Sequence, residues 1–262
     1  MDARATVTHL VKHLASGAVK VVDLTAPLGP DTPVIELPPE AGKNSPRVKV
    51  HKISRYDQDG PLCAWNWMEL GEHTGTHFDA PVHWYTGKAL ANASTDTIPL
   101  QDFIAPVVVI DRSKEVQKNP DYLLTAESIR EWEAEHGTIT HGSWVLLRTD
   151  WHKRNTSTKE FLNVDGNGPH SPGPAADAIA YLLDRGALGF GSETVGTDAG
   201  SAFMMDPPFP AHHYLHGAGR YGLASLANLD QLPPTGAILI AAPLKLVGGT
   251  GSPLRVVAIV PT

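Results

Sequence analysis

Four side chains that can bind a divalent metal ion lie within eleven residues of this 262-residue chain. They are His73, His77, Asp79 and His83. Imidazole and carboxylate groups are ligands of zinc, manganese and iron(II) in proteins, and affinity alone does not choose among these ions. The spacing therefore favours a metal site, and a polar turn without a metal is the alternative.

The local sequence predicts an extended turn around these ligands. Gly75, its neighbouring threonines and Pro81 disfavour a helix. In an extended chain, His77 and Asp79 point the same way because they are two residues apart. Gly75 lets the backbone fold His73 back beside them. We therefore expect a compact group of two histidines and one aspartate.

A second histidine cluster lies in the segment from Pro210 to His216. Pro210 suits the first turn of a helix. Such a helix would place His212 and His216 on one face and turn His213 away. On spacing alone, a helix with solvated histidines is an equal alternative.

The segment from His73 to His83 resembles the signature of a known family. It reads His-Thr-Gly-Thr-His-Phe-Asp-Ala-Pro-Val-His. This pattern is similar to that of the cyclase family of metal-dependent amide hydrolases, which includes bacterial kynurenine formamidases and isatin hydrolases. Further segments that resemble the family are Asp23–Thr25, Phe209–His212, Ala242–Lys245 and Gly251–Arg255. The resemblance covers nearly the whole chain, and it implies a swivelling β/β/α fold.

The resemblance also implies how the metal is held. The ligands that it implies are His73, His77 and Asp79. In family members with two metals, a glutamate twelve residues after the position of His212 helps to bind the second ion. Ala224 stands there in this chain, and alanine cannot be a ligand. We therefore expect one divalent ion per chain, manganese preferred and zinc as an alternative, and we expect His83 and His212 to be catalytic.

The same resemblance suggests a substrate. Isatin hydrolases are the single-metal branch of the family, which implies hydrolysis of a cyclic aromatic amide, isatin, to isatinate. We expect Trp65 and Trp84 to contact this substrate, because aromatic rings near the metal turn suit a flat bicyclic molecule. Ser225 would help to orient it. The alternative substrate within the family is N-formylkynurenine, which arylformamidases hydrolyse.

In the expected reaction, the metal lowers the pKa of a bound water so that hydroxide exists near neutral pH. The hydroxide attacks the amide carbonyl, and His83 moves a proton to the leaving nitrogen.

Two other classes of protein stay open. His77, Asp79 and His212 also match the two-histidine, one-carboxylate triad of iron(II) oxygenases. A metal-stabilised binding protein would bind a ligand without turnover.

Composition limits the partners and the compartment. The formal net charge of −7 disfavours nucleic acid and anionic membranes, which both need a cationic face. Cys63 is the single cysteine, so an internal disulfide and a thiolate-rich metal site are excluded. The sequence has neither an apolar run near 18 residues nor a secretory signal, so we expect the cytoplasm. A small aromatic amide is the expected partner, and a homodimer the expected assembly.

The elements that would position the two histidine groups are strands and helices in alternation. Val7, Leu10, Val11 and Leu14 recur at helical spacing, and Gly17 predicts a C-terminal cap. Apolar runs predict strands over residues 19–24, 47–55, 64–70, 107–110, 144–147, 187–191, 238–241 and 254–260. Helices are predicted around Ile129 and Ile179. Because the early strands lack intervening helices, we expect an α/β fold with a mixed sheet in one domain, residues 1–262.

Overall fold

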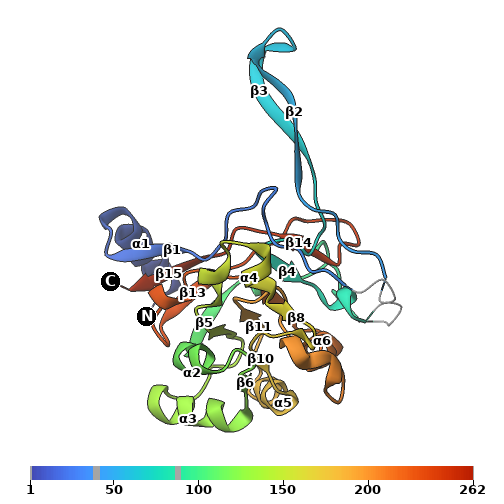
Figure 1. Ribbon diagram of the computed structural model, residues 1–262. Coiled ribbons are helices and arrows are strands. Elements are labelled where there is room, and N and C mark those ends of the chain that lie inside the picture. Colours follow the sequence, from blue (N-terminus) through green and yellow to red (C-terminus); the bar gives the residue numbers. More distant parts are fainter. Residues whose placement is uncertain (1, 38–41, 86–89, 262) are drawn as a thin grey trace.

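The computed structural model describes residues 2–37, 42–85 and 90–261. A nine-stranded sheet runs through it (Figure 1). In spatial order the strands are β1 (Val19–Asp23), β15 (Val257–Pro261), β13 (Ala237–Ile240), β5 (Ile104–Asp111), β7 (Trp144–Arg148), β11 (Gly189–Ser192), β12 (Tyr221–Ala224), β4 (His77–Asp79) and β14 (Gly251–Pro253). From β5 to β12 the neighbours are parallel, and the strands on both sides of them are antiparallel. The expected mixed sheet is therefore confirmed.

Helices and shorter elements complete the described ranges. The helices are α1 (Ala3–Ser16), α2 (Ser113–Lys118), α3 (Ala126–His136), α4 (Thr158–Leu162), α5 (Ala176–Asp184) and α6 (Pro210–Gly217). The remaining strands are β2 (Lys49–Asp57), β3 (Gly60–Glu69), β6 (Leu123–Leu124), β8 (Val164–Asp165), β9 (Gly168–Pro169) and β10 (Gly173–Pro174). Short 3₁₀ turns include Pro81–His83. None of the helices that the structure describes combines the length and the apolar character needed to cross a membrane.

The sheet is curled, because strands from opposite ends of the strand order share one core. Val22 of β1 and Val260 of β15 lie in the same buried apolar cluster as Phe78 of β4 and Leu223 of β12. Burial of such side chains stabilises the fold by about 1.5–3 kcal/mol each. The strand that carries His77 and Asp79 is therefore anchored in the main core by the residue between them.

A second apolar cluster fills the space between the parallel strands and the helices. Val108 and Ile110 of β5 belong to it, together with Ile129 of α3, Ile179 of α5 and Leu215 of α6. The alternate residues of β5 face the core inside the curl instead, as the period of two in a strand requires. Helices thus cover the convex face of the parallel strands.

Strands β2 and β3 form a hairpin that projects from the body of the molecule (Figure 1). Both strands were expected from the sequence, but they pair with each other and lie outside the main sheet. Leu62 is 89% exposed, Trp65 is 57% exposed and Trp67 is 50% exposed. The ring of Trp67 stacks on His51 with centroids 3.9 Å apart. The hairpin therefore presents apolar and aromatic side chains to its surroundings.

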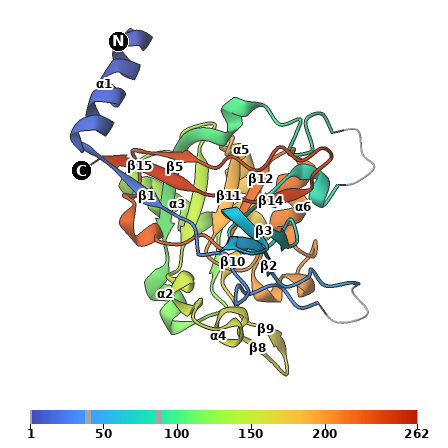
Figure 2. The same cartoon turned by 90° about the horizontal axis from the view of Figure 1, so that it is seen from above.

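The predicted N-terminal helix is confirmed as α1. Asp2 accepts a hydrogen bond from the backbone N–H of Arg4 at its start, and Gly17 caps its end in the left-handed conformation, with φ of 73°. All of its side chains are described, and none of them is buried. The helix leaves the body beside β1 (Figure 2).

Candidate metal centre

The turn before β4 has the extended form that the sequence predicted. Gly75 adopts a φ of 61°, and a side chain there would meet Leu28 Cδ1 at 3.1 Å. This left-handed turn returns His73 to the end of β4, where His77 and Asp79 point to the same side of the strand. The Nδ1 of His77 lies 2.7 Å from the carbonyl oxygen of Gly75. The turn thus both folds the chain back and fixes one imidazole.

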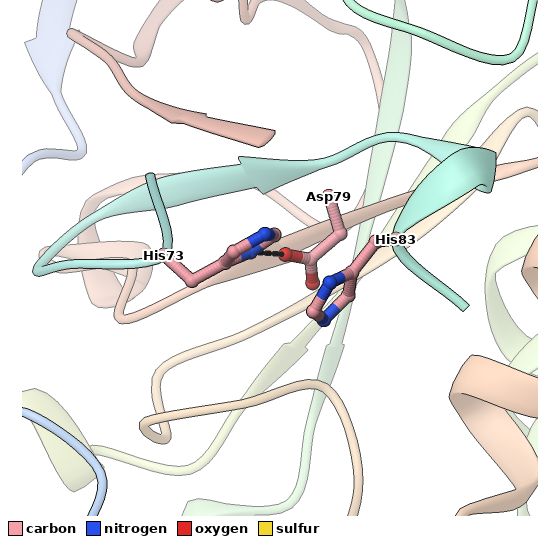
Figure 3. A group of neighbouring side chains, drawn as sticks. All are labelled: His73, Asp79 and His83. Carbon is pink, nitrogen blue, oxygen red and sulfur yellow. Dashed lines mark hydrogen bonds and ion pairs between the residues drawn. The ribbon is translucent and has the colours of Figure 1, made fainter. Parts of the chain in front are cut away.

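Asp79 is the centre of the group (Figure 3). Its carboxylate is buried, and its Oδ1 lies 2.7 Å from His73 Nδ1 and 3.3 Å from His77 Nε2. Its Oδ2 is buried without a hydrogen-bond partner among the described residues. Ligand atoms around an ion at about 2.1 Å lie roughly 3 Å apart, and Oδ1 of Asp79 lies at about this separation from each of the two nitrogens. Two imidazoles and one carboxylate are thus a donor set whose chemistry suits a divalent ion.

The hydrogen bonds behind the two imidazoles decide which nitrogen of each carries a proton. A carbonyl oxygen only accepts, so His77 donates from Nδ1 to Gly75 and turns the lone pair of Nε2 toward Asp79. The hydroxyl of Thr250 donates to Glu72, so it accepts from Nε2 of His73 at 2.9 Å. The Nδ1 lone pair of His73 then also faces Asp79.

Two imidazole lone pairs and one carboxylate oxygen thus converge in a buried place. Three acceptors repel one another there unless a cation lies between them. Burial acts to lower the pKa of His77, yet the carboxylate of Asp79 raises it overall. Burial likewise acts to raise the pKa of Asp79, yet His77 and His73 hold it well below its usual value. Both shifts express a demand for positive charge, which a metal ion meets.

Helix α6 supplies the second histidine group, and the predicted division of its histidines is confirmed. His212 and His216 both face the site, with ring centroids 5.4 Å and 6.1 Å from His83. His213 packs instead against the ring of Tyr85, with centroids 5.8 Å apart. His216, for which the sequence gave no role, therefore belongs to the cluster.

Asp198 orients His212 from behind. Its Oδ2 lies 2.5 Å from His212 Nδ1, and its carboxylate also accepts the backbone N–H groups of Ala211 and His212 in the first turn of α6. Burial acts to lower the pKa of His212, but Asp198 raises it overall. His212 thus binds a proton more readily than it would without Asp198.

His83 completes the cluster from the 3₁₀ turn that follows β4. Its ring stacks on His73 with centroids 3.8 Å apart. Ligand atoms of His73, Asp79 and His83 lie within 4.8 Å of one another, as do those of Asp79, His212 and His216. Burial lowers the pKa of His83 to about 3 and that of His216 to about 4, so both rings are neutral at neutral pH.

The three residues expected to contact the substrate lie in different places. The ring of Trp84 lies 5.0 Å from His212 and 5.6 Å from Phe209, centroid to centroid, so it borders the cluster. Ser225 is buried next to β12, where its carbonyl oxygen accepts a hydrogen bond from Thr76. Trp65 stands on the projecting hairpin (Figure 1).

Ala224 stands at the position where the resemblance implies a glutamate in two-metal relatives. It lies directly opposite His77 in the pairing of β12 with β4. Residues opposite each other in an antiparallel pair place their side chains on the same face of the sheet. Ala224 is fully buried. A carboxylate at this position would therefore reach the face of the sheet that carries the His77 imidazole.

Several residues of the site were not found from the sequence. Glu72 is adjacent to His73, but its partner Thr250 is 178 residues away. Asp198 precedes His212 by 14 residues, a distance that no helix or strand period marks. The pairing of Asp198 with α6 depends on tertiary structure, so no local pattern in the sequence pointed to it.

Comparisons with known proteins give a consistent result. The model of the family described as "Putative cyclase" matches residues 22–199. An isatin hydrolase of Roseibium aggregatum is 59% identical over 261 residues, which cover 100% of this chain and 99% of that protein. A kynurenine formamidase of Salinibacter ruber is 32% identical over 78% of this chain and 84% of its own length. The crystal structure of an isatin hydrolase bound to the product analogue thioisatinate superposes with a TM-score of 0.98, at 59% identity and 100% coverage of both chains.

Removal of one ligand tests the metal centre. We expect His77→Ala to reduce the metal content of the purified protein from about one ion per chain to nearly none, because the remaining ligands are too few to hold a labile ion. Elemental analysis measures this content. His213→Ala is the matched control, since His213 faces Tyr85, and it should keep its metal. Full metal content in His77→Ala would refute the ligand set.

Restoring the missing carboxylate tests the number of ions. We expect the native protein to bind one ion tightly and Ala224→Glu to bind a second one, because the new carboxylate would lie on the same face as His77. Titration calorimetry with manganese and anomalous scattering would count the ions. Ala224→Gln is the control for side-chain volume. Two tightly held ions in the native protein would contradict the single-ion model.

Proposed function

Because this chain belongs to the cyclase family, we propose that it is a metal-dependent hydrolase that opens the cyclic amide of isatin to isatinate. The observation that carries the proposal is the convergence of two imidazole lone pairs on the buried carboxylate of Asp79. This site occurs in a chain that is 59% identical, over its whole length, to an isatin hydrolase. The family and the chemistry of the site thus support the same reaction.

We propose His73, His77 and Asp79 as the metal ligands. When bound, the ion would supply Lewis acidity, which lowers the pKa of a coordinated water and stabilises negative charge on the amide oxygen. Two nitrogens and one oxygen without sulfur suit manganese, zinc and iron(II). Manganese is our proposal among them, on the family resemblance.

His83 is the residue that we propose to move the proton. Burial keeps this ring neutral at neutral pH, so one of its nitrogens is unprotonated when water adds to the amide carbonyl. The carbon–nitrogen bond then breaks, and His83 returns the proton to the ring nitrogen that leaves. His73, on which His83 stacks, keeps this imidazole beside the ligands.

His212 has a different proposed role. Asp198 raises its pKa and holds its ring by Nδ1, so Nε2 is the nitrogen left to donate to the substrate. A donor fixed in this way stabilises a negative oxygen without having to reorganise. Ser225, which directly follows β12, is proposed to help orient the substrate.

The aromatic side chains near the site would select a substrate by its shape. Trp84 and Phe209 border His212, and a flat bicyclic ring can stack between such side chains. Trp65 lies on the projecting hairpin, so as a substrate contact it would serve the site of a second copy. Such a contact between two copies requires an assembly like the homodimer expected from the sequence. The dimer and the cytoplasmic compartment stay predictions.

N-formylkynurenine is the alternative substrate, because a kynurenine formamidase is 32% identical to most of the chain. Its amino acid part carries an ammonium group, which needs a carboxylate partner. Among the described residues of the site, the carboxylates of Asp79 and Asp198 contact imidazoles, and that of Glu72 accepts from Thr250. This favours the neutral ring of isatin.

Substrate preference is tested by offering the two amides separately. We expect the specificity constant of the manganese-loaded protein for isatin to exceed that for N-formylkynurenine by about tenfold or more, because an unpaired ammonium group is costly in the site. The absorbance change of each substrate gives kcat/KM. A higher value for N-formylkynurenine would assign the chain to the alternative. Turnover of isatin under anaerobic conditions without a 2-oxo acid would separate this hydrolase from an iron(II) oxygenase.

The role of His83 is tested by its removal. We expect His83→Ala to lose about 10²- to 10⁴-fold in kcat, roughly 3–5 kcal/mol, as is typical of a proton-transfer residue, while it keeps its metal. Turnover and elemental analysis of the same preparation give both quantities. Parallel loss of metal and activity would make His83 a ligand. Unchanged turnover would mean that His83 does not move the proton and that His212 is the next candidate. Loss of turnover in His212→Ala in the same assay would then support that role.

A further inference from the structure

His73 is the one of the three proposed ligands that lies outside β4. It precedes the left-handed turn at Gly75. Its ring stacks on His83 with centroids 3.8 Å apart. The ring also lies against the backbone of β14, because a side chain at Gly251 would meet Cε1 of His73 at 2.5 Å. Packing on these neighbours therefore fixes where the imidazole lies.

Packing does not decide which nitrogen of this ring carries the hydrogen. A neutral imidazole has nearly the same shape in both tautomers, so its hydrogen-bond partners select between them. Oδ1 of Asp79 lies 2.7 Å from Nδ1 of His73, and a carboxylate only accepts hydrogen bonds. Without a cation, Asp79 therefore favours the hydrogen on Nδ1. That tautomer lacks the Nδ1 lone pair with which a metal ion would be bound.

The hydroxyl of Thr250 could support either tautomer, because a hydroxyl both donates and accepts. Its Oγ1 lies 2.9 Å from Nε2 of His73. If the hydroxyl donated to Nε2, the ring hydrogen would lie on Nδ1 and point at Asp79. The single hydrogen of the hydroxyl goes instead to Oε2 of Glu72, at 2.5 Å. Thr250 is thus left as an acceptor, and Nε2 of the neutral ring is the donor.

Thr250 and Glu72 are held together by more than this one bond. Oε2 of Glu72 also accepts from the backbone N–H of Thr250, at 3.1 Å. The backbone carbonyl oxygen of Thr250 accepts from the N–H of Ala80, at 2.9 Å, and so ties Thr250 to the end of β4. The hydroxyl that faces His73 is therefore oriented from a frame that belongs to the sheet.

We propose that Glu72 and Thr250 are positioning residues that keep the Nδ1 lone pair of His73 available to the metal ion. This inference rests on the proposed metal site and is independent of which amide is the substrate. Without Glu72, the hydroxyl is free to donate to Nε2, and His73 closes the site with a hydrogen bond from Nδ1 to Asp79. The ring then has to change its tautomer before an ion can bind, which lowers the affinity.

Manganese affinity, measured by competition with a chelator, tests this relay. We expect Thr250→Val and Glu72→Ala each to weaken binding by about 10- to 100-fold, as is typical of partners behind a metal-binding histidine. Because the two residues act as a unit, the double variant should bind no more weakly than either single variant. Thr250→Ser keeps the hydroxyl, and Glu72→Gln keeps an oxygen that both donors of Thr250 can select. Both should therefore stay close to the native affinity.

Thr95→Val is the matched control for loosening of the loop that leads to Thr250. Thr95 is buried, and its hydroxyl donates to the carbonyl of Leu246, at 3.0 Å. Its backbone N–H donates to the carbonyl of Gly249, at 3.0 Å. The variant removes a hydroxyl from this loop and leaves the bond between Glu72 and Thr250 in place. We expect it to lower the melting temperature and to keep the native manganese affinity.

Three results would overturn the proposal. They are native affinity in both Thr250→Val and Glu72→Ala, losses that add in the double variant, and an equal loss in Thr95→Val. If the native protein bound no manganese, the metal site and the proposal would fail together. If it bound manganese tightly and every variant did so too, only the proposal would fail. None of these measurements uses a substrate, so they are separate from the test of isatin hydrolysis.

Discussion

The site depends on a repulsion among neutral imidazoles and a carboxylate, which positive charge relieves, whether it comes from a proton or from a cation. In the neutral rings, the hydrogen bonds to Gly75 and Thr250 occupy one nitrogen each, so Nε2 of His77 and Nδ1 of His73 turn their lone pairs toward one oxygen of Asp79. In the low-dielectric interior, placing hydrogen-bond acceptors this close together without a donor or cation costs free energy. The surrounding fold maintains this arrangement, so binding of a cation there would relieve an unfavourable interaction that the protein already contains.

The sequence was sufficient to predict the groups whose geometry is local. The period of a strand places His77 and Asp79 on one side, Gly75 permits the turn, and Pro210 starts a helix whose period separates His212 from His213. Each of these predictions depends on residues within one turn or one strand. Local backbone preferences decide such features with little help from the rest of the chain.

Features that depend on distant pairing could not be predicted in this way. The strands containing His51 and Trp65 were recognised as strands, but nothing in their alternation shows that they leave the main sheet as a hairpin. The spacing of Val7 and Val11 predicts an apolar helix face, and it does not tell whether the same chain covers that face. Thr250 and Glu72 meet across 178 residues, and only the assembled sheet brings them together.

The short strand β4 has a consequence for how the protein is made. It has three residues, and it pairs with β12 and β14, whose residues follow it by about 145 and 175 positions. Contacts so distant in sequence form late, since the loops between them cost entropy that must be overcome first. During synthesis, the motif from His73 to Asp79 leaves the ribosome long before either neighbouring strand exists. The proposed ligands would therefore remain unorganised until nearly the whole chain is complete, and a metal ion would be selected only by the geometry of the finished protein.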